Sequence, residues 1–431
     1  MSLLFYIRRS FMNKYIEKYI KFFKHENYNI SLIIKINILF LLFFMSYDSM
    51  TVTIPLYITN LKVGVSYYGT IMAITLIIRG LIAIPISHLE ISNKFKILNF
   101  VMLINLLTLI ILMLVENFIL TFLGFIVFLS SVSVLNVIVN PILASISPKD
   151  NYGISFGIRD IFLFSGSAIG LFITGIIKKL SDYQNIFLFN LILLIFIIIL
   201  IFIIKRDFEN LNFYKEKSKS LNENNSSKQN LNIKEKLKKN LSFIKNDKNF
   251  IYYCIVCSLL TIATTGLTYI PLIAKEYNIS EQNIYNAMST SLIISALLSI
   301  LGGKIIDKNN KKKVYLLYIF MLFISYICFG LNNKGLFLLG MFIYSLTVAL
   351  DNISQVYFFS IFENNIADKY FGIISSLTLI IGSISRQISG YIWDINFNYI
   401  IQISTLLMFI TLIISYFKLN EINEEPKLKR K

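Results

Sequence analysis

Residues 303–313 read Gly-Lys-Ile-Ile-Asp-Lys-Asn-Asn-Lys-Lys-Lys and join two long apolar blocks, Ile284–Ile306 and Val314–Leu331. Each block is long enough to cross a bilayer, which takes about 20 apolar residues in a helix. The polar stretch between them is short and strongly basic, which is typical of a tight loop at one membrane face. We therefore expect a pair of membrane helices here, and the same pattern extends in both directions along the chain.

The whole chain is built from such apolar blocks. It has 431 residues, of which 56% are hydrophobic and 15% are charged. Backbone groups in lipid must bond within their own segment, so each block is expected to be helical. This composition excludes a soluble enzyme, a secreted disulfide scaffold, a disordered chain and an outer-membrane barrel. The sequence predicts an all-α integral membrane protein with twelve transmembrane helices, over Ile30–Leu61, Tyr68–Leu89, Ile97–Val115, Phe118–Ile146, Gly153–Ile177, Ile186–Ile204, Phe250–Ala274, Ile284–Ile306, Val314–Leu331, Gly335–Ile361, Phe371–Trp393 and Tyr399–Phe417.

The twelve blocks form two related halves. Ile54-Pro55-Leu56 in the first block matches Ile270-Pro271-Leu272 in the seventh, 216 residues further along. Gly157 and Gly175 bracket the fifth block, and Gly372 and Gly390 bracket the eleventh, each 215 residues further along. Many transporters are built from such repeats, with the substrate site between them. We expect two six-helix bundles related by an internal repeat.

Polar stretches divide the chain into five segments. The long stretch between the halves holds twelve Lys or Arg and six Asp or Glu over residues 205–249. The N-terminal stretch is basic with interleaved apolar residues, as in an amphipathic helix on a membrane surface. The predicted segments are an N-terminal cytoplasmic segment (1–29), a first bundle (30–206), a cytoplasmic linker (207–249), a second bundle (250–418) and a cytoplasmic tail (419–431).

The distribution of the basic residues, which give the chain a net charge of +17, predicts its orientation in the membrane. The basic residues gather between apolar blocks on one side, and basic loops stay cytoplasmic. We therefore expect a multi-pass protein of the cell membrane with both termini in the cytoplasm. Nucleic-acid binding is not expected, because the charge is accounted for by topology. With two histidines and an isolated Cys254–Cys257 pair, no metal site or cofactor is predicted either.

The quoted stretch resembles the loop signature of the major facilitator superfamily, G-x-x-x-D-R-x-G-R-R/K. Gly303, Asp307, Lys308, Lys311 and Lys312 match it by type, with Asn310 in place of the second glycine. The resemblance implies a conformational latch in which the carboxylate pairs with basic residues of the next turn.

The first half carries a weaker copy of this signature. Glu90 and Lys94 are in register with Asp307 and Lys311, but the leading glycine and the first basic residue are missing. The alternative to a latch, for both copies, is a tight loop with cytoplasmic positive charge.

A second resemblance lies in the first block, where residues 47–56 read Tyr-Asp-Ser-Met-Thr-Val-Thr-Ile-Pro-Leu. This is similar to the first helix of drug–proton antiporters in the same superfamily. It implies that Asp48 titrates and exchanges a proton for substrate. The arginine that the family associates with proton coupling in the fourth helix is absent from the fourth block.

Ionisable residues inside apolar blocks are costly and mark functional sites by default. A structural pair between Asp48 and Arg79 is the alternative to a titrating Asp48. Arg159 and Asp160 point about 100° apart on a helix, so we expect each to need another partner. The candidates for substrate binding and proton coupling are Asp48, Arg79, Arg159, Asp160, Asp351 and Arg386.

These features favour a secondary active transporter, and no catalytic set points to an enzyme. The leading hypothesis is proton-coupled efflux of a small organic solute by a monomer in contact with membrane lipid. The alternatives are uptake of an anionic metabolite through the arginines and a lipid-linked-oligosaccharide flippase. An integral-membrane transferase, for which only His88 and Asp160 are suitably placed, is the least favoured.

Overall fold

The computed structural model describes residues 30–87, 89, 91–114, 118–146, 152–209, 247–351, 353–362 and 364–419. The described chain is all helical, which confirms the predicted fold class. Its elements are α2 (Ile30–Asn60), α3 (Val65–Ser87), α4 (Ile91–Leu114), α5 (Phe118–Ile146), α6 (Tyr152–Leu180), α7 (Tyr183–Glu209), α10 (Lys248–Thr264), η3 (Thr265–Tyr269), α11 (Ile270–Glu276), α12 (Glu281–Lys308), α13 (Lys311–Gly330), α14 (Lys334–Val348), α15 (Ile353–Ile361), α16 (Asn364–Ile395) and α17 (Phe397–Lys418).

Every predicted apolar block corresponds to helix in the structure. Within the described residues, nine helical stretches are long and apolar enough to cross a membrane. The other three blocks are α12, the broken pair α14 and α15, and α16, which is 32 residues long.

Two blocks are interrupted where the sequence predicted continuous helices. The seventh is divided by the short 3-10 segment η3, and the tenth is broken between Val348 and Ile353. Hydropathy reports burial in lipid but not local backbone geometry, so it could not show these breaks.

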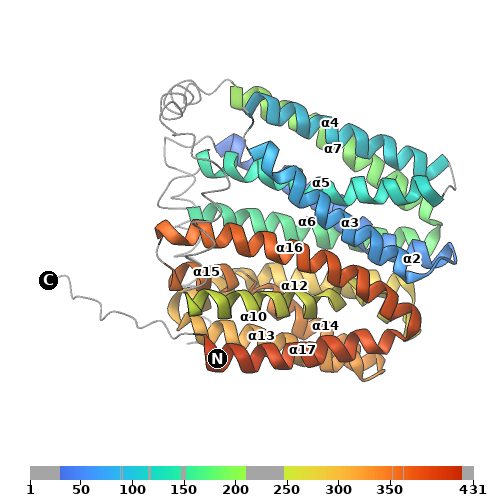
Figure 1. Ribbon diagram of the computed structural model, residues 1–431. Helices are drawn as coiled ribbons and strands as arrows, with labels where there is room; N and C mark the ends of the chain where they lie inside the picture. Colours follow the sequence, from blue (N-terminus) through green and yellow to red (C-terminus); the bar gives the residue numbers. More distant parts are fainter. Residues whose placement is uncertain are drawn as a thin grey trace, which may run out of the picture.

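The helices form two groups that lie side by side along one interface (Figure 1). One group comprises α2 to α7 and the other α10 to α17. The interface between them is made by α6 with α12, by α3 with α16, and by α2 with α11. We call the end where α7 stops and α10 starts the linker end, and the opposite end, where α6 stops and α12 starts, the far end.

Several predicted features fall outside the described residues. They are the segment 1–29, Glu90, His88, linker residues 210–246 and tail residues 420–431. At the edges of the predicted linker, α7 continues to Glu209 and α10 begins at Lys248. The helices thus extend slightly into the segment that the sequence assigned to the linker.

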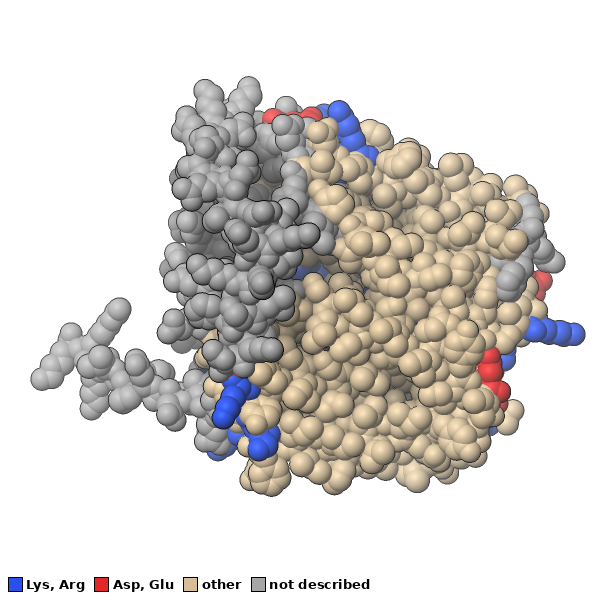
Figure 2. Space-filling model, in the orientation of Figure 1, with Lys and Arg blue, Asp and Glu red and all other residues tan. Residues whose placement is uncertain are grey.

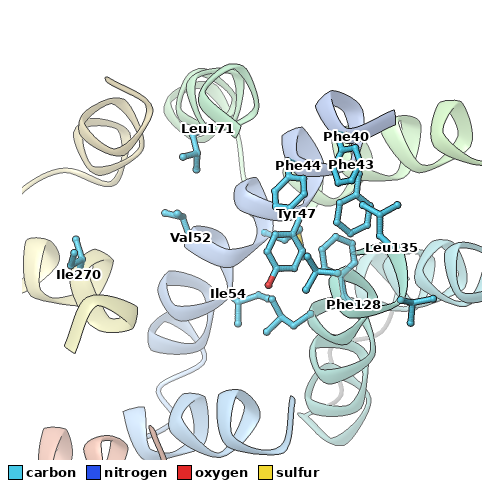
Figure 3. Packing of buried hydrophobic residues seen from close by; sticks show 14 of the residues in the cluster. Phe40, Phe43, Phe44, Tyr47, Val52, Ile54, Phe128, Leu135, Leu171 and Ile270 are labelled. Carbon is cyan, nitrogen blue, oxygen red and sulfur yellow. The ribbon is translucent and has the colours of Figure 1, made fainter. Parts of the chain in front are cut away.

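The first bundle is fixed by an aromatic stripe on α2. Phe40, Phe43, Phe44 and Tyr47 recur at helical spacing and are buried. The rings of Phe43 and Tyr47 stack with centroids 5.8 Å apart, and Phe40 and Phe44 stack at 6.2 Å. Figure 3 shows the stripe facing Phe128 and Leu135 of α5. This packing fixes Tyr47, and therefore Asp48, one residue further on.

Candidate functional site

Two glycines on one face of α6 lie in different surroundings at the two ends of the helix. Gly157 and Gly175 are 18 residues apart, which is five turns, so they point the same way. A Cβ on Gly175 would lie 3.0 Å from the Tyr285 Cβ of α12, whereas a Cβ on Gly157 would meet nothing within 4 Å. The contact of α6 with α12 is therefore tight at Gly175, near the far end, whereas Gly157, near the linker end, faces open space.

The site candidates lie at successive depths between the bundles. At about 1.5 Å per residue, Arg386 is about 14 Å from the far end of its helix, Asp48 about 18 Å and Arg79 about 21 Å. Asp351 and Asp160 follow, closer to the linker end. The two bundles both contribute, so the candidates line one interface at different levels.

Asp48 is half-buried on α2, and its carboxyl group interacts with the Ser167 side chain of α6. It does not pair with Arg79, which was the alternative to a titrating Asp48. Arg79 instead donates to the Tyr47 hydroxyl and to the Leu129 carbonyl of α5, the latter from Nε at 3.1 Å and from Nη2 at 2.6 Å. The Tyr47 hydroxyl and the Leu129 carbonyl thus occupy Nε and Nη2 of Arg79, and no ion pair with Asp48 is formed among the described residues.

Asp351 lies in the break between α14 and α15, and its side chain is exposed. The Tyr318 hydroxyl of α13 donates to its Oδ1 at 3.1 Å. Tyr344 of α14 is within electrostatic range of both Asp351 and Asp48. Tyr344 is therefore close to one carboxylate from each bundle.

Arg159 and Asp160 pair with each other, contrary to the prediction that each would need another partner. Arg159 donates from Nε and Nη2 to Asp160 Oδ1 at 3.0 and 2.5 Å. Its Nη1 donates to Asn140 Oδ1 at 2.9 Å, and the guanidinium lies 4.8 Å from the Phe156 ring centroid. The prediction failed because it compared Cα–Cβ directions, and an arginine side chain is long enough to bend back to its neighbour.

Arg386 lies at the deepest level, among aromatic residues. It is in electrostatic range of Arg79 and of the Tyr47, Tyr68 and Tyr269 side chains. Within the described chain, its Nε is buried and has no hydrogen-bond partner. The nearby carboxylate of Asp394 is bonded elsewhere, to backbone amides of α3.

Asp394 closes the far end, a role that the sequence did not indicate. Its carboxylate oxygens accept hydrogen bonds from the Val65 and Ser66 amides at 2.8 and 3.2 Å. A carboxylate of α16 therefore caps α3 of the other bundle, where the helix dipole favours negative charge.

Glu281 forms a second contact between the bundles at the far end. It lies 3.3 Å from the Lys275 ammonium and 3.6 Å from that of Lys178, and it accepts a hydrogen bond from the Tyr183 hydroxyl at 2.7 Å. In the sequence, Lys178 stands out only as a basic residue on the side opposite to the other basic stretches. Its pairing across the interface explains why it is tolerated there.

The latch residues are only partly described. Gly303, Asp307 and Lys308 are in the last turns of α12, but the placement of their side chains is not described, so the latch stays a prediction. Lys311 and Lys312 begin α13, which Asn310 caps by accepting from the Lys312 amide at 3.0 Å. Lys94, from the first-half copy, lies on the first turn of α4 and is half-buried.

Metal binding receives no support from the described residues, among which no group of three His, Cys, Asp or Glu side chains is suitably placed. The described arrangement brings ionisable side chains of both bundles to one interface.

Comparison with known proteins agrees with this geometry. The family model described as the Major Facilitator Superfamily matches residues 36–273 and 251–431. No curated protein matches the sequence.

Solved structures with the same fold include a mutant form of the nucleoside transporter NupG and a D-xylose-proton symporter. The TM-scores are 0.69 and 0.70, at 14% and 13% identity. These matches cover 90% and 92% of this chain, and 100% and 99% of the other chains. The xylose transporter XylE from E. coli in an inward-open conformation is similar at a TM-score of 0.67 and 12% identity, with 91% of this chain and 98% of that one covered.

Proposed function

Because the chain belongs to the major facilitator superfamily, we propose that it is a proton-coupled transporter that exports a small organic solute from the cell. The family assignment makes it a multi-pass membrane transporter of a small molecule. The fold neighbours are described as transporters of a nucleoside and of D-xylose with protons, so solutes of that size fit the proposal. Direction and coupling rest on the residues of the interface.

The observation that carries the proposal is that two carboxylates at the interface have no basic partner among the described residues. Asp48 and Asp351 come from different bundles, and both are within electrostatic range of Tyr344. Among the described residues, neither forms an ion pair with a lysine or arginine, whereas Asp160 and Asp207 both do. A carboxylate at membrane depth without a basic partner is costly unless it binds a proton or a cation.

We infer an exchange in which the proton and the solute compete for these carboxylates. We infer that the space between the bundles opens at the linker end, where Gly157 of α6 faces open space. We place that end in the cytoplasm, with both termini, because the basic stretches of the chain gather there. Solute would enter from the cytoplasm, and rocking of the bundles would open the far end, where protons displace it.

The test uses everted vesicles in which respiration acidifies the lumen. Cationic, neutral and anionic compounds are added in separate runs while the lumenal pH is recorded. For a cationic solute we expect wild-type protein to discharge the gradient, and Asp48→Asn to discharge it more than about tenfold more slowly. Asp182→Asn, which changes an exposed carboxylate at the far end, is the matched control and should behave as wild type. Equal rates for Asp48→Asn and wild type would overturn the role of Asp48.

Uptake of an anionic metabolite is the second candidate, and Arg386 favours it. Its buried Nε lacks a partner in the described chain and lies near Arg79, so two guanidiniums could receive one carboxylate or phosphate. Under this alternative, only anionic compounds would be transported, and Arg386→Gln would abolish transport while Asp48→Asn would not.

A further inference from the structure

The second bundle has an apolar groove on its outer surface, away from the interface with the first bundle. It has a volume of roughly 440 Å³ and lies between α13 and α17. Its lining is almost entirely apolar and includes aromatic rings at the α17 side. The lining residues are Leu316, Leu317, Phe320, Leu412, Ile413, Tyr416 and Phe417.

The groove lies at the linker end, directly below a basic rim. Leu316, Leu317 and Phe320 follow Lys313 at intervals of three, four and seven residues, so all four share one face of α13. On α17, Lys418 follows the lining residue Phe417, but its ammonium lies 5.6 Å from the ring centroid of Tyr252 on α10, so Lys313 is the lysine on the groove itself. Both lysines are exposed, and Figure 2 shows basic side chains gathered at the linker end of this bundle.

A second surface pocket at the same end shows what distinguishes this groove. That pocket is lined by Phe202, Ile203, Lys205, Arg206 and Glu209 of α7. Its cations have acidic partners, since Lys205 lies 3.9 Å from Glu209, and Arg206 lies 3.9 Å from Asp207. Among the described residues, Lys313 and Lys418 have no acidic partner, so of these two sites the α13–α17 groove is the one that presents uncompensated charge above an apolar floor.

We propose that this groove binds one anionic phospholipid of the cytoplasmic leaflet. Acyl chains fill the apolar floor, and the phosphate headgroup lies at Lys313. Basic pockets between membrane helices on the cytoplasmic side are suited to such headgroups, and each lysine near the surface contributes about 1 kcal/mol, or about fivefold in affinity. The placement of the linker end in the cytoplasm rests on the proposed function, whereas lipid binding itself does not.

The test exploits the single tryptophan of the chain, Trp393, which lies near the far end. Phe320→Trp is made in a Trp393→Phe background, so that fluorescence reports on the groove. The protein is reconstituted in phosphatidylcholine vesicles with a minor fraction of brominated phosphatidylglycerol or of brominated phosphatidylcholine. We expect the anionic lipid to quench at least about fivefold more effectively than the neutral lipid at equal mole fraction.

Two lysine variants decide whether the headgroup contact is specific. Lys313→Gln should lower the preference for brominated phosphatidylglycerol about fivefold. Lys205→Gln, at the same end but paired with Glu209, should leave it unchanged. Equal quenching by both lipids, or a preference unaffected by Lys313→Gln, would overturn the proposal. If neither brominated lipid quenches the introduced tryptophan, and chemical crosslinking yields dimers, the groove would instead be occupied by a second copy of the chain. Since no transport is measured, failure of the efflux proposal would not affect this result.

Discussion

The contact between α6 and α12 is tight at the far end and open at the linker end, although both ends present a glycine on the same face of α6. Gly175 has no room for a Cβ, whereas Gly157 faces open space. The contact between α3 and α16 is also tight at the far end. A Cβ on Gly69 of α3 would lie 2.7 Å from the Arg386 carbonyl oxygen of α16. The difference teaches that two glycines on one face of a single helix lie in opposite surroundings, which rocking of the bundles would exchange under the efflux proposal.

The largest effect is expected from leucine at the two α6 glycines. Gly175→Leu inserts a side chain where the Tyr285 Cβ is 3.0 Å from a Cβ, so it should force the far end open. Gly157→Leu fits the present state but would obstruct closure at the linker end. The rate of alkylation of a cysteine at Thr70, which bonds Gln387 across the far interface, reports on opening. We expect about a tenfold increase for Gly175→Leu and no increase for Gly157→Leu. Equal rates in the two variants would contradict the comparison.

The next effect concerns the cap that Asp394 places on α3. Asp394→Ala removes acceptors for the Val65 and Ser66 amides, which costs about 1 kcal/mol and should raise far-end alkylation about fivefold. Asp394→Asn keeps an oxygen that can cap a helix, so its rate should stay near that of wild type. If alanine and asparagine act alike, the capping account is wrong.

Glu281 should have a smaller effect, because its partners are partly exposed. Glu281→Gln weakens its contacts with Lys178 and Lys275, and we expect about a twofold to threefold rise in far-end alkylation. High salt should raise the wild-type rate toward that of the variant, since it screens such pairs. A difference that persists unchanged at high salt would argue against an electrostatic contact.

The smallest effect is expected at the ion pair of Lys35 and Asp207, which lies within the first bundle at the linker end. Lys35→Met should lower the free energy of unfolding by at most about 1 kcal/mol, because both side chains are partly exposed. Far-end alkylation should be unchanged, and thermal unfolding provides the stability measurement. A changed alkylation rate would mean that this pair takes part in switching.

Much of the fold could be predicted from the sequence because lipid imposes a strong rule on hydropathy and on backbone hydrogen bonds. The twelve apolar blocks follow from that rule, and the repeat follows from matching motifs at a constant offset; the structure and the two family-model matches agree with both. The breaks at η3 and between α14 and α15 could not be predicted, since apolar residues occur on both sides of each break. The break at α14–α15 positions Asp351, so the sequence identified this residue as a candidate without indicating its setting.

The sequence identified the charged residues of the candidate site, but it did not indicate which residues they contact. Buried charges stand out in apolar blocks, which is how Asp48, Arg79 and Arg386 were found. Their partners depend on contacts between distant helices, as for Asp394, whose bonded amide lies 329 residues away in the sequence. Short-range geometry also misled at Arg159, whose long side chain reaches the adjacent carboxylate.

The central claim is that the two ends of the interface open in alternation, driven by the state of Asp48. The direct measurement is of two distances by pulsed electron spin resonance, in a background without Cys254, Cys257 and Cys328. One label pair, Leu180 with Ile395, spans the bundles at the far end, and the other, Lys96 with Lys418, spans them at the linker end. We predict that Asp48→Asn, or protonation at low pH, lengthens the first distance and shortens the second in the same sample. Distances that stay fixed, or that change in the same direction, would contradict alternating access controlled by Asp48.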